Sequence, residues 1–215
     1  MAEPILTKWF EQTRIGDTPK VGGKGASLGE MFQKLSESGV KVPNGFTLTT
    51  DAFSRFVDSE IPERTWDNVR NPEGLEEIRN EAIKQTNLRK ALEVCLRGVD
   101  LGKELELNAR AALARSLVRE TPVPESVKLA IGSDYGKLCD IYYPGVDVAV
   151  RSSATTEDSK EASFAGQYES FLNVSGKAEI VEKWRRCVAS MFTERSVGYH
   201  LENGLHPLES AVAVV

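Results

Sequence analysis

A glycine-rich turn that contains a lysine lies near the start of the chain, in KVGGKGASLGE, residues 20–30. Glycine allows positive φ angles and lets backbone N–H groups come close to a ligand. The turn precedes apolar residues with helical spacing, and a helix N-terminus attracts anions. Lys24 adds a full positive charge with three donors. We therefore expect Gly22, Gly23, Lys24 and Gly25 to bind phosphate; a solvated turn with an ordinary surface lysine is the alternative.

Neither of the two common glycine-loop motifs fits this stretch. A Walker A loop requires G-x-x-x-x-G-K-[ST], but Gly25 follows Gly23 and Lys24, and Thr18 stands five positions before Gly23. The dinucleotide motif G-x-G-x-x-G fails at its third glycine, where Leu28 stands. The turn therefore has glycines, a lysine and a helix start without either motif, and any phosphate that it binds is held in another way.

Arg151 is the second candidate, within VDVAVRSSATTED. Valines alternate over residues 146–150, which predicts a strand with Arg151 projecting from its end. The guanidinium is a planar fork of donors that suits phosphate oxygens, and Ser152 and Ser153 can add hydroxyl or backbone donors. An ion pair of Arg151 with Glu157 or Asp158, with serines that only cap a helix, is the alternative.

A third candidate lies in SFAGQYESFLNV, where Gly166 precedes a second predicted strand, ESFLNV. A glycine just before a strand often marks the close approach of another backbone or of a ligand. A bulge without function is the alternative interpretation of Gly166.

The predicted elements around these motifs mix helices and strands. Leu28, Met31, Phe32 and Leu35 have the spacing of one apolar helix face. Residues 60–125 are polar and helical in pattern, and we interpret them as a helical insertion or cap without chemistry of its own. The final SAVAVV is apolar and β-branched, so we expect a strand there and a chain that is a fragment of a longer protein.

Composition excludes several classes of protein. The chain has 215 residues, a net charge of −5, 40% hydrophobic and 27% charged residues, so a folded soluble domain is expected. Its acidic balance argues against nucleic-acid or membrane-surface binding, and no apolar run is long enough to span a bilayer. Cys95, Cys139 and Cys187 are odd in number and far apart, which favours the cytoplasm and argues against a metal site.

Four segments, in this order, resemble one family: VGGKGASLGEM, VPNGFTLTTDAF, VRSSATTEDSKEASFAGQYESFLNV and SAVAVV. They are similar to the N-terminal nucleotide-binding region shared by phosphoenolpyruvate synthases, pyruvate phosphate dikinases and rifampin phosphotransferases. The resemblance runs from about Trp9 to Val215, with residues 60–140 fitting loosely. KWFEQ and ATTEDSKEASFAGQ favour the synthases, whereas Gly25 replaces an asparagine common in them.

The resemblance implies an α/β (α+β) fold in which residues 1–215 form the first lobe of an ATP-grasp domain. It implies that Lys24 and Arg151 contact the ATP phosphates as catalytic residues, and that Gly166 and Ser170 lie along the nucleotide site. Ser170 stands where relatives often have threonine.

The same resemblance implies a reaction in which ATP, pyruvate and water give AMP, phosphoenolpyruvate and phosphate through a phosphohistidine. The phosphohistidine, the pyruvate site and the Mg²⁺ ligands are expected beyond residue 215, so this chain alone is expected to be inactive. A homo-oligomer of the whole protein is a further expectation. The alternatives are an antibiotic phosphotransferase or a pyruvate phosphate dikinase with the same ATP lobe, and a non-catalytic nucleotide-binding module.

Overall fold

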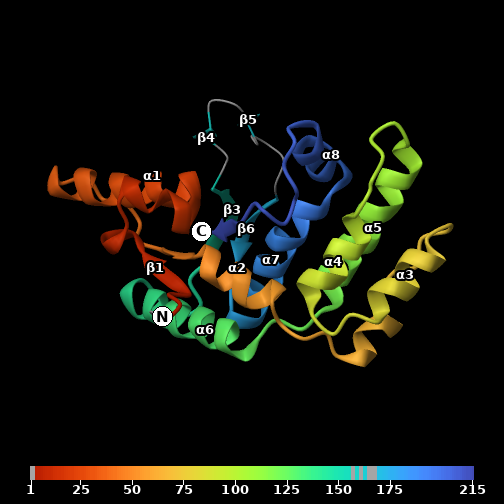
Figure 1. Ribbon diagram of the computed structural model, residues 1–215. Coiled ribbons are helices and arrows are strands. Elements are labelled where there is room, and N and C mark those ends of the chain that lie inside the picture. Colours follow the sequence, from red (N-terminus) through yellow and green to blue (C-terminus); the bar gives the residue numbers. More distant parts are fainter. Residues whose placement is uncertain (1–2, 156–157, 160–161, 164–168) are drawn as a thin grey trace.

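The computed structural model describes residues 3–155, 158–159, 162–163 and 169–215. Helices and strands alternate irregularly along the chain (Figure 1). Their bounds are β1 (Thr7–Trp9), η1 (Phe10–Gln12), η2 (Ile15–Asp17), α1 (Thr18–Glu37), β2 (Phe46–Leu48), α2 (Thr50–Val57), η3 (Glu63–Asp67), α3 (Glu76–Ile83), α4 (Leu88–Leu96), α5 (Glu104–Glu120), α6 (Glu125–Ile141), β3 (Val148–Ala154), β4 (Asp158–Ser159), β5 (Ala162–Ser163), β6 (Ser170–Val174), α7 (Lys177–Ala189), η4 (Ser190–Phe192), α8 (Glu194–Glu202) and β7 (Val212–Val214).

A five-stranded antiparallel sheet in the order β1-β2-β7-β3-β6 forms the centre of the fold. The last strand in sequence, β7, lies between β2 and β3, with Val214 opposite both Leu48 and Ser152. Residues directly opposite each other share a sheet face, and neighbours along a strand alternate between faces. Ser152 therefore faces one side of the sheet, while Arg151 and Ser153 face the other.

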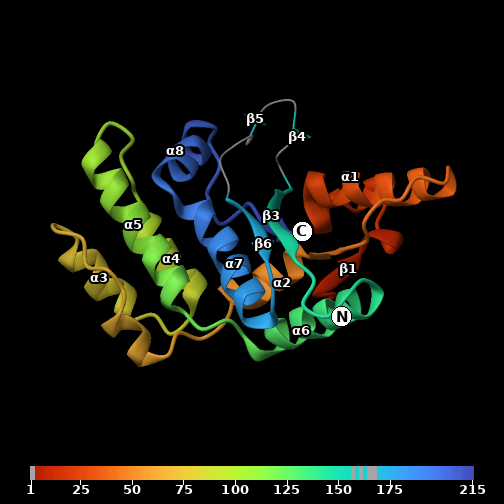
Figure 2. The same ribbon diagram turned by 180° about the vertical axis from the view of Figure 1, so that it is seen from behind.

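Helices cover the two faces of this sheet unequally. Helix α1 packs against β2, β3 and β7, while α2 and α7 also contact the sheet. Figures 1 and 2 show the N-terminal end of α1 beside β3 and the rest of the helix extending away from the sheet, and Lys20 at this end pairs with Asp51 of α2 at 2.6 Å. The N-terminal part of α1 therefore covers the sheet face that carries Ser153, and the opposite face packs against the main core.

The main core joins the sheet to the helical part of the chain. Residues 60–125 contain η3, α3, α4 and α5, so the predicted helical character is confirmed. Leu113 and Leu117 are fully buried in the same apolar cluster as Trp184, whose ring lies 5.4 Å from that of Phe56. The helical region is thus packed into the same core as the sheet, and burying such side chains stabilises the fold by about 1.5–3 kcal/mol each.

Helix α1 forms as predicted, but its apolar stripe is not its packing face. Met31 and Leu35 are 44% and 39% exposed. The residues that α1 buries are small: Val21, Gly22, Gly23, Gly25, Ala26 and Gly29. Glycines bring the helix backbone against its neighbours, so α1 packs through its glycine face.

Strand β3 corrects the sequence prediction for Arg151. The strand extends to Ala154, so Arg151 lies in its middle rather than at its end. The serines after Arg151 belong to the strand and cap no helix. The prediction of a strand at ESFLNV is confirmed by β6, and the terminal strand by β7.

Candidate phosphate-binding site

Helix α1 is broken at Gly22, which has φ 69° and ψ 172°. This combination is accessible essentially only to glycine. A Cβ at Gly22 would also lie 2.1 Å from the carbonyl oxygen of Ser153 on β3, far inside contact distance. Gly22 therefore allows both the break and the close approach of the turn to the strand.

A second helical segment begins after the break, and Lys24 lies half-buried in its first turn. N–H groups in a first turn have no acceptor within the helix. The N–H of Gly25 meets this need with the hydroxyl oxygen of Ser153, at 3.0 Å. The N–H groups of Gly23 and Lys24 belong to the same turn, so they are the backbone donors that we consider for an anion.

Arg151 lies on the sheet face that contacts this turn. It exchanges two backbone hydrogen bonds of 2.8 Å with Val215, and it lies opposite Ser170 on β6. Its side chain is exposed and forms no ion pair with another described residue. Residues two apart on a strand share a face, so Ser153 lies on the same face of β3 as Arg151. Ser153 contacts the glycine turn. The turn with Lys24 therefore lies on the sheet face that carries Arg151 and Ser170.

Ser152 and Gly166 are placed differently. Ser152 is 2% exposed and faces α7, where its hydroxyl donates to the carbonyl of Glu169 at 3.2 Å. The thiol of Cys187 on α7 lies 3.7 Å from the same carbonyl. Ser152 thus lies on the opposite face from Arg151, while Gly166 and Glu157 lie outside the described residues.

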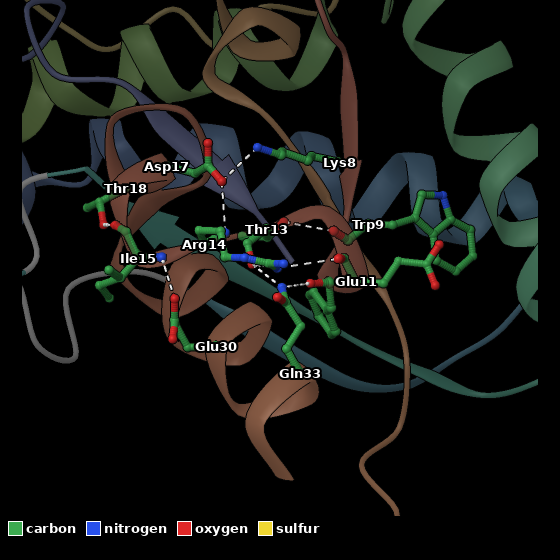
Figure 3. Close-up of polar contacts among 11 residues, drawn as sticks. Lys8, Trp9, Glu11, Thr13, Arg14, Ile15, Asp17, Thr18, Glu30 and Gln33 are labelled. Atoms are coloured by element: carbon green, nitrogen blue, oxygen red, sulfur yellow. Dashed lines mark hydrogen bonds and ion pairs between the residues drawn. The ribbon is translucent and has the colours of Figure 1, made fainter. Parts of the chain in front are cut away.

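A polar network fixes the start of α1 to the segment before it (Figure 3). The Asp17 carboxylate pairs with Lys8 at 2.7 Å and accepts the N–H of Arg14 at 2.8 Å. The hydrogen bond from Lys8, with a smaller contribution from Arg14, lowers the pKa of Asp17 despite partial burial. Farther along α1, Glu30 accepts the N–H of Ile15 at 3.1 Å. These contacts hold α1 in place on the sheet.

The glycine face of α1 makes a second close contact in this region. A Cβ at Gly29 would lie 2.6 Å from the Cβ of Thr13, a residue that is fully buried. Gln33 on the same helix donates to the carbonyls of Phe10 (3.0 Å) and Thr13 (Figure 3). The helix is therefore anchored on both sides of Lys24, which limits how far that lysine can move.

A large apolar cavity among the described residues lies outside the glycine turn, since none of Gly22, Gly23, Lys24 and Gly25 lines it. Its volume is about 500 Å³, and apolar side chains such as Phe46, Leu48 and Val150 form most of its wall. Residues of β2, β3 and β7 line it together with Leu28 of α1, and Arg151 stands at its border with the candidate site. An apolar opening of this kind does not suit phosphate, so we place the anion at the glycine turn instead.

The described residues do not fit a metal. They contain no cluster of three or more His, Cys, Asp or Glu side chains that could hold a metal ion. The residues of the candidate site carry positive charge, which suits phosphate oxygens and repels a cation. No Mg²⁺ ligand is therefore assigned within the described chain.

The comparisons with known proteins identify the family of the chain. The family model described as "Pyruvate phosphate dikinase, AMP/ATP-binding domain" matches residues 18–215, which include the glycine turn and Arg151. The chain belongs to this AMP/ATP-binding family. The predicted resemblance and the α/β class are thereby confirmed, and an ATP-grasp arrangement fits this family.

Curated relatives of this AMP/ATP-binding domain are phosphoenolpyruvate synthases. The chain is 37% identical over 217 residues to that of Synechocystis sp., with 99% of this chain and 23% of the relative covered. It is 36% identical to that of Aquifex aeolicus (97% and 22% covered) and 35% identical to that of Escherichia coli (93% and 22% covered). The domain thus spans less than a quarter of the length of these relatives.

Sequence reasoning proposed Lys24, Arg151 and Ser153 for the site, but it did not predict that Ser153 links the turn to β3. The signal was present, since residues two apart on a strand share a face, and Ser153 stands two after Arg151. It went unused because β3 was expected to end before the serines.

No helix of the described part of the chain is long and apolar enough to cross a membrane.

Proposed function

We propose that this chain is the ATP-binding region of a phosphoenolpyruvate synthase, with the ATP phosphates at the glycine turn of α1. The observation that carries the proposal is the pair of Ser153 contacts, which bring the turn with Lys24 onto the sheet face of Arg151. The names of the relatives support the choice of a synthase.

In this proposal the two cations have different tasks. Lys24 places a compact charge at the phosphates, and Arg151 offers its fork of donors to two oxygens of one phosphate. Gly22 and Gly23 let the backbone come close, and Ser170, opposite Arg151, adds a hydroxyl. Phosphoryl transfer asks a protein mainly for positioning and charge stabilisation, which these groups supply.

Two residues proposed from the sequence have a weaker place in this scheme. The hydroxyl of Ser152 is engaged on the other face of the sheet, so its contribution is to hold β3 against β6. The N–H of Gly25 is bonded to Ser153, so Gly25 shapes the turn rather than donating to the anion.

The remaining parts of the reaction are proposed for the whole protein. A histidine outside this chain accepts the phosphoryl group from ATP and passes it to pyruvate, with Mg²⁺ held by acids outside the described residues. A cytoplasmic location and a homo-oligomer belong to the same proposal. A pyruvate phosphate dikinase or an antibiotic phosphotransferase would use the same ATP contacts with another final acceptor.

An NMR titration of the ¹⁵N-labelled chain tests the ATP site directly. ATP should shift the amide signals of Gly23, Lys24 and Arg151, and inorganic triphosphate should shift the same signals. Adenosine should leave them in place because it carries no phosphate. Shifts that leave the Gly23 and Lys24 amides in place, or no shifts at all, would contradict the proposal.

A further inference from the structure

Ser153 makes two hydrogen bonds that bridge the break in α1. Its hydroxyl donates to the carbonyl of Val21, before the break, at 2.8 Å. The same oxygen accepts the N–H of Gly25, after the break, at 3.0 Å. Ser153 is fully buried, so one hydroxyl from β3 satisfies both ends of the glycine turn away from water.

The turn and the strand also fit by shape. Gly22 lies between the two hydrogen-bonded residues, and a Cβ there would meet the carbonyl oxygen and the hydroxyl oxygen of Ser153 at 2.1 and 2.3 Å. The backbone of Gly22 thus rests directly on Ser153. Three successive contacts, at Val21, Gly22 and Gly25, leave the turn little freedom to slide along β3.

We propose that Ser153 is the positioning residue of the phosphate site, because it sets the place of Lys24 relative to Arg151. Residues two apart on a strand are separated by about 6.6 Å and share a face. Arg151 therefore lies two residues along β3 from Ser153, whose hydroxyl holds the turn that contains Lys24. This inference rests on the proposed ATP function, and it assigns Ser153 no contact with ATP.

Removal of the hydroxyl isolates this role, because Ser153→Ala changes no charge. The carbonyl of Val21 and the N–H of Gly25 then lose their common hydrogen-bond partner. An unsatisfied buried polar group is costly, so both groups shift toward other partners or toward water. The first turn of the second helical segment shifts, and Lys24 with it. Binding of ATP weakens although both cations remain in the chain.

A double-mutant cycle with ATP as the probe separates positioning from stability. If Lys24→Ala alone weakens ATP binding by about tenfold, it should weaken binding less than about threefold in the Ser153→Ala background, because Lys24 is already misplaced there. A serine that serves stability alone gives additive effects, with the same loss in both backgrounds. Ser190→Ala is the matched control, since Ser190 is 2% exposed and donates to the carbonyl of Cys187 at 2.7 Å.

Hydrogen exchange of the Gly25 amide provides a measurement that needs no ligand. Exchange of this amide should become at least tenfold faster in Ser153→Ala, while amides of α5 keep their rates. Ser153→Cys, which retains a weak donor and acceptor, should restore part of the ATP affinity, and it replaces Ser153→Ala in the cycle if the alanine variant does not fold.

The outcomes distinguish this inference from the proposed function. Non-additive ATP effects with faster exchange at Gly25 support it. Additive effects, or unchanged exchange at Gly25, overturn it while the ATP site stands. Absence of ATP binding by the unaltered chain overturns the proposed function and this inference together.

Discussion

Gly22→Ala should destabilise the chain strongly, because two separate costs meet at this position. The backbone at φ 69°, ψ 172° lies in a region that is essentially closed to other residues, at about 1–3 kcal/mol. The new Cβ would also lie 2.1 Å from the Ser153 carbonyl, and relief of such overpacking costs about 1–3 kcal/mol. The expected loss is about 2–6 kcal/mol, out of about 5–15 kcal/mol for a typical domain.

Urea denaturation followed by circular dichroism measures this loss. Gly136→Ala is the matched control, since Gly136 lies within α6 and a Cβ there has no neighbour within 4 Å. That substitution should stabilise the chain by about 0.4–1 kcal/mol through higher helix propensity and a less flexible unfolded state. A Gly22→Ala variant within about 1 kcal/mol of the unaltered chain would refute the described turn.

Two further predictions concern buried titratable groups. Burial of His200, with a smaller effect of His206, lowers its pKa below 6.5 despite the hydrogen bond to the Ser196 carbonyl. Its contribution to stability is therefore present above pH 6.5 and lost as the pH falls below that value, and an imidazole pKa of 6.5 or more by NMR titration would contradict this. Burial raises the pKa of the Cys95 and Cys187 thiols to about 12, so iodoacetamide at pH 8 should leave both unlabelled in the folded chain and label them in denaturant. Mass spectrometry that finds either thiol labelled as fast in the folded chain as in denaturant would contradict this burial.

The sequence was sufficient to propose Lys24 and Arg151 because the patterns around these two residues are local. The glycines around Lys24 and the alternating valines before Arg151 are visible within a few positions, and a helix and a strand formed there, although β3 continues beyond its expected end. The order of the motifs also identified the family, which the comparisons confirm.

The contacts that join these motifs could not be predicted because they are distant in sequence. Ser153 meets Val21 and Gly25 across more than a hundred residues. Two adjacent serines resemble a loop, but in β3 one hydroxyl is satisfied by α1 and the other by the carbonyl of Glu169, so both tolerate burial. The strand could therefore continue through residues that looked like its end.

The packing face of α1 was also beyond local reasoning. Periodicity shows that apolar residues such as Met31 and Leu35 share a face, but not whether another element covers it. The glycine face of α1 packs against β3 because glycine has no side chain, so the two backbones can approach as closely as they do at Gly22.

The affinity of the chain for ATP in four variants tests the central claim most directly. A hydrogen bond to a charged group contributes about 1.5–3 kcal/mol, so Lys24→Ala and Arg151→Ala should each weaken ATP binding by about 10- to 100-fold. Lys84→Ala and Arg119→Ala remove the same charges from exposed positions of the helical region and should change the affinity less than about twofold. Calorimetry or NMR titration that finds equal affinities in all four variants would contradict the phosphate site at Lys24 and Arg151.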